Sequence, residues 1–214
     1  MNYIDKISEI AGQAYQDFEA RTLARDNALT KARSLTRHSA NAIRAIHRGE
    51  ADEAHSQLQE GQKLFEALKA ELEVYPDLYY AGYTQDAIKE HCEATLTCAF
   101  IENEPIPTAE EMGVLTATYL RGMAETPGEL RRRCMDILRM GYSEEAERLL
   151  SLMDEIYSIL ITMDYPDAVT NGLRRQTDLL RGIVERTRAD LTLSLREEKL
   201  KAELQKAIEV FEKK

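Results

Sequence analysis

The hydrophobic residues of this chain recur every three or four positions over long stretches, and few residues interrupt the pattern. This period is typical of amphipathic helices, and no segment shows the alternation that predicts a strand. The five prolines stand at positions 76, 105, 107, 127 and 166, so long segments without proline lie between them. The pattern therefore predicts an all-α fold, a bundle of six or seven long helices.

Residues with known start and packing preferences refine the expected helices. Thr108 and Glu111 form a capping box, in which each side chain binds the backbone N–H of the other, so a helix is expected to start there. Ser143 is followed by two glutamates whose charge suits the positive end of a helix dipole, so it starts the next helix. Gly61 lies in an apolar stripe and is expected to let another helix approach. The expected helices span about 3–47, 53–73, 84–103, 108–141, 143–165 and 169–214.

Composition places the chain among globular proteins. Its 214 residues, 43% of them apolar, suffice for one core, so a single domain is expected over residues 1–214. No run of about 18 apolar residues and no signal-peptide pattern occurs, which predicts a cytoplasmic protein. Cys92, Cys98 and Cys134 are odd in number and lack C-x-x-C spacing, so we expect reduced core cysteines rather than disulfides or a zinc site.

The charge of the chain is unevenly distributed. The formal net charge of −10 argues against nucleic-acid binding by the surface as a whole. Between Arg21 and Arg48, however, seven Lys or Arg stand against one Asp, a net charge of +6 that leaves −16 on the rest. Four arginines of this segment fall within about 60° of one another on a helical wheel and form an arginine stripe: Arg33, Arg37, Arg44 and Arg48.

The arginine stripe has two interpretations. A guanidinium group can hold phosphate oxygens bidentately, so the stripe predicts contact with a nucleic-acid backbone, and such binding depends on salt. The alternative is a solvated helix face or a set of interhelical salt bridges with the many glutamates. The pattern alone leaves both open.

Two glutamate pairs are the candidates for catalytic chemistry. Glu90 and Glu93 are three residues apart, and Glu125 and Glu129 are four apart, so each pair projects from one side of its helix. Two antiparallel helices could bring all four together. Clustered carboxylates prefer a hard divalent cation, Mg²⁺ or alternatively Mn²⁺. Such an ion lowers the pKa of a bound water and stabilises charge on a phosphoryl oxygen, which predicts phosphodiester hydrolysis.

Simpler explanations exist for each glutamate pair. In a chain with 38 acidic residues, a pair at helical spacing is often a solvated face. Glu93, however, lies within about 60° of Leu96 and Phe100 on the wheel, which places at least one acid near the packed face. Residues 126–129 form a capping box with proline at the first helical position. On that interpretation the helix restarts there and Glu129 only closes its end.

Other common site types have no signature in the sequence. It contains no P-loop, dinucleotide fingerprint or nucleophile elbow, and its tyrosines do not follow an RNA-recognition motif. The four histidines show no ligand spacing to a second His or Cys and are expected to be structural: His38, His47, His55 and His91.

Three segments resemble the family of translin and its partner Trax. The segment YPDAVTNGLRRQTDLLRGIVERTRADLT, from Tyr165 to Thr192, is similar to the family's C-terminal helix, including its NGLRRQTD core. LYYAGYTQDAIKEHCEA, from Leu78 to Ala94, resembles the aromatic lead into an E-x-x-E helix. YLRGMAETPGEL resembles a segment in which Trax carries an acid, two residues, a glycine and a glutamate. The likeness covers most of the chain and is weakest in the first 50 residues.

The resemblance implies a seven-helix α-fold in a hollow octamer, with single-stranded RNA or DNA bound inside and Mg²⁺-dependent RNA cleavage by the Trax-type subunit. Glu90 and Glu93 match the Trax acid pair, Glu129 matches its later glutamate, and Glu125 stands where Trax has aspartate. Pro127 is a second departure, since a proline in a helix interior can kink a helix that the family keeps continuous. Because all four acids are present, the resemblance favours a Trax-like, catalytic-type member of the family. An archaeal-type homologue is one such member.

Residues and resemblance together predict a Mg²⁺-dependent endoribonuclease acting on single-stranded RNA. The four glutamates hold the metal inside a hollow oligomer, one of them accepts the proton of the attacking water, and the arginine stripe orients the strand. The alternatives are a non-catalytic translin-type protein that binds single-stranded RNA or DNA, and an oligomeric scaffold. A homo-octamer and an assembly with a paralogous subunit both remain open, and no membrane partner is expected.

Overall fold

The computed structural model describes residues 2–212, which contain helices and no β-strand. Two single-turn helices lie wholly or partly in the gaps between the expected helices, α3 (Pro76–Tyr79) and α7 (Asp167–Thr170). No helix in this part of the chain offers the long apolar stretch that crossing a bilayer requires. The all-α prediction is confirmed. The six long helices are α1 (Tyr3–His47), α2 (Ala51–Glu71), α4 (Gly82–Glu102), α5 (Thr116–Leu138), α6 (Glu144–Leu160) and α8 (Leu173–Glu212).

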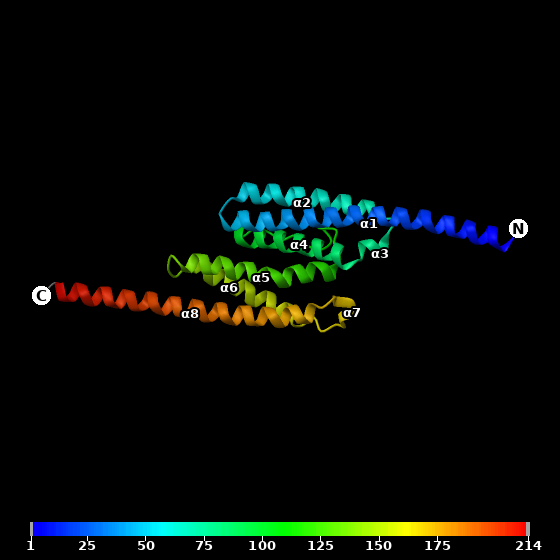
Figure 1. Cartoon of the computed structure of the whole chain (residues 1–214). Helices are drawn as coiled ribbons and strands as arrows, with labels where there is room; N and C mark the ends of the chain where they lie inside the picture. The colour runs from blue at the N-terminus through cyan, green and yellow to red at the C-terminus, as the bar shows by residue number, and fades with distance from the viewer. Residues whose placement is uncertain (1, 213–214) are drawn as a thin grey trace.

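The long helices pack side by side in a continuous series. α1 and α2 form a hairpin, α1 also lies against α4, and α4 packs on α5, which contacts α6 and α8 (Figure 1). The first half of α1 and the last part of α8 extend from opposite ends of this body. The main core lies between α4, α5, α6 and α8, where Leu96, Leu130, Met153 and Leu180 are fully buried. This arrangement places α4 and α5 at the centre of the molecule.

The fourth expected helix begins at Thr116 rather than at Thr108. The capping box itself forms, because the Thr108 N–H donates to the Glu111 carboxylate at 2.7 Å and the Glu111 N–H donates to the Thr108 hydroxyl at 3.1 Å. Gly113 then adopts a positive φ of 66°, which ends the turn. The predicted start was wrong because a capping box shows where a turn begins, not whether a helix follows.

α5 continues through Pro127 without a break. The hydroxyl of Thr126 donates to the carbonyl oxygen of Gly122, one turn back at 3.0 Å, and this side chain is fully buried. It therefore does not cap a new helix, and the interpretation that the helix restarts there was wrong. Proline removes one backbone donor from the helix, but the packing on both sides holds α5 together. Glu129 is consequently a residue of the helix interior.

Two glycines allow helices to approach α4 closely. A Cβ on Gly61 would lie 3.0 Å from Nδ1 of His91, so this glycine lets α2 contact α4, as the sequence predicts. The contact at Gly122 of α5 is tighter, because a Cβ there would lie 2.8 Å from Cβ of Cys92 and 2.9 Å from the Lys89 carbonyl oxygen. No rotation of a side chain relieves such contacts, so Gly122 sets the separation of α4 and α5.

The three cysteines are free and buried, as expected from their number and spacing. Burial raises the pKa of the Cys92 and Cys98 thiols to about 12 and that of the Cys134 thiol to about 11. They remain protonated at neutral pH and act as small core residues.

Candidate metal centre

Carboxylates of α4 and α5 converge beside Gly122. Glu90, Glu93 and Glu125 each offer one oxygen, and these oxygens lie within 4.8 Å of one another. The spacing of three residues brings the first two to one side of α4, and the close contact at Gly122 brings Glu125 of α5 up to them. The predicted convergence therefore occurs for three of the four glutamates.

Glu93 is the most buried member of this carboxylate cluster, with 9% of its surface exposed. Burial, followed by the negative charges of Glu90 and Glu125, raises the pKa of Glu93 to about 8, although the Lys89 ammonium opposes the shift. Its carboxyl group is therefore mostly protonated at neutral pH when no further cation is present. The prediction that one acid lies near the packed face is confirmed.

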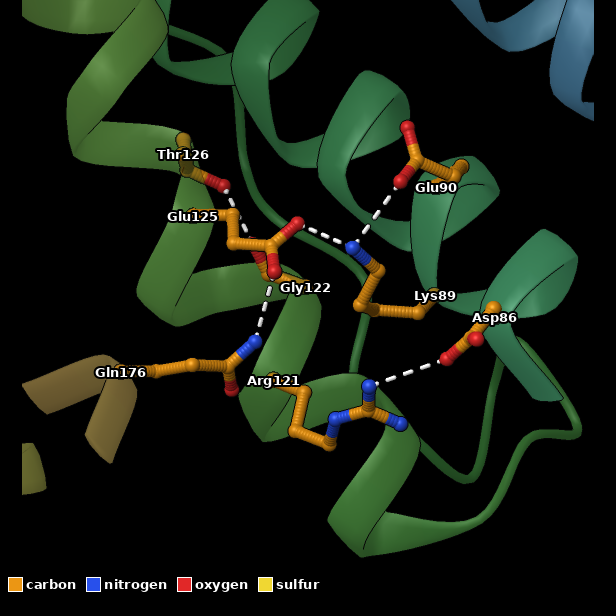
Figure 2. A network of polar contacts seen from close by, with 8 residues as sticks. All are labelled: Asp86, Lys89, Glu90, Arg121, Gly122, Glu125, Thr126 and Gln176. Atoms are coloured by element: carbon orange, nitrogen blue, oxygen red, sulfur yellow. Dashed lines mark hydrogen bonds and ion pairs between the residues drawn. The ribbon is translucent and has the colours of Figure 1, made fainter. Parts of the chain in front are cut away.

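One cation is already built into the cluster, and the sequence analysis missed it. Lys89 of α4 is only 7% exposed, and its ammonium forms ion pairs with Glu125 and, at 2.9 Å, with Glu90 (Figure 2). Burial lowers the pKa of Lys89, but hydrogen bonds to the two carboxylates outweigh this effect and hold it above its usual value. Lys89 therefore remains charged between two of the three converging acids.

Glu129 lies one turn further along α5 and binds a different partner. Its Oε2 is 2.7 Å from Nε2 of His47, the last residue of α1, whose side chain is 3% exposed. The hydrogen bond to His47 lowers the pKa of Glu129, so this acid is ionised. Nδ1 of His47 has no hydrogen-bond partner among residues 2–212. Glu129 is thus outside the three-carboxylate cluster, although its charge also raises the pKa of Glu93.

The other three histidines have structural partners, as expected. Burial lowers the pKa of His91 to about 4, so its ring is neutral in the core. His47 differs from these three, because it binds the site residue Glu129. The structural pairs join neighbouring helices: His38 with Gln57 at 2.7 Å, His55 with Glu102 at 2.8 Å, and His91 with Gln62 at 3.2 Å.

Gln176 of α8 also reaches the cluster. Its side-chain amide donates to Oε1 of Glu125 at 2.6 Å (Figure 2). This glutamine belongs to the NGLRRQTD segment that carries the family resemblance, so its position in that motif was the available sequence signal. A second contact between α4 and α5 lies nearby, the ion pair of Arg121 with Asp86 at 3.0 Å. Three helices therefore fix the position of Glu125.

The arginine stripe is exposed along its whole length on α1. Arg33 and Arg37 form no ion pair within the described residues, and Arg48 pairs with Glu50 just beyond its own helix. The geometry does not support interhelical salt bridges by the stripe itself. The ion pairs between α1 and later elements use other basic residues: Arg21 with Asp77 at 2.5 Å and Lys31 with Glu71 at 2.8 Å.

The carboxylate cluster suits a hard divalent cation. Three glutamates face a single ammonium group, and this deficit of positive charge adds to burial, the main cause of the raised pKa of Glu93. The donors are all carboxylate oxygens, which Mg²⁺ and Mn²⁺ prefer over softer ligands. The residues present therefore fit such an ion.

Comparisons with known proteins agree with this fold. The sequence model of the translin family matches residues 13–196. Protein MJ0175 of the archaeon Methanocaldococcus jannaschii is 30% identical over 184 residues, covering 85% of this chain and 81% of that protein. The structure of AfC3PO with duplex RNA matches with a TM-score of 0.81 and 32% identity, over 87% of this chain and 97% of that one. Apo-NeC3PO, at 22% identity over 86% and 96% of the two chains, has a TM-score of 0.78 and shows the fold alone.

Replacing Glu93 with Gln is expected to stabilise the metal-free protein at about pH 8 and much less at about pH 5. The folded pKa of about 8 lies above the ordinary value of 4.5, so the folded state binds more protons than the unfolded state. Wild-type stability therefore falls as the pH rises through this window, whereas a neutral amide avoids the loss. Thermal unfolding in EDTA should show a gain of roughly 3 °C or more at the higher pH.

The matched control for this experiment is Glu73→Gln, which neutralises an exposed glutamate outside the cluster. Its unfolding temperature should stay close to that of the wild type at both pH values. If Glu93→Gln changed the unfolding temperature equally at both pH values, burial of the ionised Glu93 carboxylate would not be the cause of the change.

Proposed function

Because the chain belongs to the translin family, we propose that it is a Mg²⁺-dependent endoribonuclease that cuts single-stranded RNA. The observation that carries the proposal is the cluster of Glu90, Glu93 and Glu125, with Glu129 beside it. A divalent ion held there would lower the pKa of a coordinated water and offset negative charge on a phosphoryl oxygen. Both effects favour phosphodiester hydrolysis at neutral pH.

The protein's own side chains would orient the acids before RNA binds. Gln176 of α8 holds Glu125 through a hydrogen bond, and His47 of α1 holds Glu129 in the same way. A carboxylate of the site then accepts the proton of the attacking water. Because these partners come from helices packed on either side of α4 and α5, the geometry is set by the fold rather than by the substrate.

RNA as the substrate class is supported by AfC3PO, which has been solved with duplex RNA and is 32% identical to this chain. On this chain, the exposed arginine stripe of α1 would contact phosphates, which position a strand without specifying its sequence. Single-stranded RNA is the proposed substrate and single-stranded DNA a second ligand. Duplex RNA is the comparison that any binding experiment should include.

A homo-oligomer is proposed from two exposed apolar faces, with the octamer implied by the family resemblance as the expected form. Large exposed apolar patches on soluble proteins usually mark contacts with other chains. Native mass spectrometry of the full chain is expected to give eight copies, and a monomer would contradict the proposal. The exposed residues are Tyr3, Ile4, Ile7, Ile10 and Phe18 on α1, and Leu193, Leu200, Leu204 and Phe211 on α8.

A non-catalytic translin-type protein that binds RNA or DNA is the alternative. One observation favours it, since the ion pairs of Lys89 with Glu90 and Glu125 already neutralise part of the cluster without a metal. The two functions share the fold and the nucleic-acid contacts. They differ in whether the bound strand is cut.

Purified protein is expected to cut an end-labelled single-stranded RNA with Mg²⁺ or Mn²⁺ and to leave it intact in EDTA. Glu125→Gln and Glu129→Gln each remove one negative charge from the site and should slow cleavage by on the order of 100-fold. Glu73→Gln, which lies outside the site, should cut like the wild type. Binding of RNA without cutting in either metal would support the non-catalytic alternative.

Replacing Arg37 and Arg44 with Glu is expected to weaken RNA binding and make it less dependent on salt. Each lost phosphate contact should reduce the slope of log affinity against log salt by about 1. Fluorescence anisotropy with a labelled strand at several salt concentrations measures both effects. The control variant carries Lys63→Glu on α2 and Arg139→Glu at the end of α5, two exposed positions that change the net charge equally. Equal RNA binding by the two variants would show that the arginine stripe is not part of the RNA-binding site.

A further inference from the structure

The geometry points to Lys89 as a built-in counter-cation that occupies part of the metal site and must leave it when a divalent ion binds. This inference rests on the proposed function, because it concerns the same carboxylate cluster. It goes further by assigning a role to a residue that is not a ligand. In this role Lys89 holds the metal-free site together and weakens its affinity for metal.

The ammonium group of Lys89 lies between two of the candidate metal ligands. Nζ of Lys89 pairs with Oε2 of Glu125 and lies 2.9 Å from Oε1 of Glu90, so it joins two carboxylates from two helices (Figure 2). These are two of the three acids whose oxygens converge within 4.8 Å. The ammonium group therefore uses oxygens that a divalent ion would need.

A divalent ion would compete with the Lys89 ammonium group for the same negative charge. The ion among these oxygens and the ammonium between the same carboxylates would be like charges a few ångströms apart, in a partly buried site. The two cations therefore exclude each other from this position. Without either of them, the carboxylates of Glu90 and Glu125 would repel each other across the contact between α4 and α5.

Packing against α5 holds the backbone of Lys89 in place. Its carbonyl oxygen lies against Gly122, where a Cβ would come within 2.9 Å, so the backbone cannot move without separating α4 from α5. The side chain is a flexible four-carbon stem that ends in a compact charge. Departure of the ammonium group therefore involves a change of the Lys89 side-chain conformation and no movement of its backbone.

The test is Lys89→Met, which keeps an unbranched side chain but removes the charge. Mn²⁺ is titrated into the full-length protein by isothermal calorimetry, and thermal unfolding is followed in EDTA and in Mn²⁺. The variant should bind Mn²⁺ at least about tenfold more tightly than the wild type, because no cation has to be displaced. It should unfold at a lower temperature in EDTA and gain more from Mn²⁺. Lys89→Gln serves as a second neutral variant should the methionine prevent folding.

The matched control is Arg121→Met. It removes the other ion pair between α4 and α5, with Asp86, without touching the carboxylate cluster. Its stability in EDTA can fall, but its Mn²⁺ affinity should equal that of the wild type. A gain in affinity for both variants would show a general effect of positive charge and would overturn the specific role of Lys89.

The outcomes separate this inference from the proposed function. Equal or weaker Mn²⁺ binding by the neutral variants, with clear binding by the wild type, overturns the role of Lys89 and leaves the metal site intact. Binding of Mn²⁺ by the neutral variants and not by the wild type supports the inference, since Lys89 then prevents metal binding completely. Absence of Mn²⁺ binding from all of them overturns the metal site and the role of Lys89 together.

Discussion

The backbone of α5 passes α4 at Gly122 with no room for a Cβ, and the arrangement of the site depends on this contact. It sets the distance across which Glu125 faces Glu90 and Glu93, because helices that were further apart would not bring the three oxygens within 4.8 Å. The contact also lies beside the backbone of Lys89. One small residue therefore positions the carboxylates and the cation that joins them.

Bringing carboxylates together in this way opposes folding, because burial and mutual repulsion both disfavour the charged form. The protein offsets this cost by three means. First, Glu93 retains a proton. Second, the Lys89 ammonium pairs with Glu90 and Glu125. Third, Gln176 donates a hydrogen bond to Glu125, and His47 donates one to Glu129. A divalent ion would replace the first two, since it supplies positive charge where the proton and the ammonium now supply it. The site is therefore stable without a metal and suited to one.

The helices could be predicted from the sequence because the 3.6-residue period and the prolines are local signals. Local signals also caused the errors. The capping box at Thr108 forms but starts only a turn, and Pro127 lies within a helix that packing on both sides maintains. Two features of the family resemblance, the acid pairs and the NGLRRQTD segment, supply the residues that converge at the candidate site.

The partners of the acids could not be predicted in the same way. Lys89 was missed because α4 is buried on most of its sides, so a helical wheel does not show which of its polar residues face the acids. His47 and Gln176 reach the site from α1 and α8, at positions far from the acids in sequence. Such pairings follow from the packing of whole helices, which residue spacing does not specify.

The central claim is that the cluster on α4 and α5 is a divalent metal site. Anomalous diffraction from a crystal of the full chain grown with Mn²⁺ at about pH 8 tests it most directly. An anomalous peak is expected between the carboxylates of Glu90, Glu93 and Glu125, with the Lys89 ammonium displaced from it. Ordered carboxylates that still enclose the ammonium group, with no anomalous peak among them, would contradict the account.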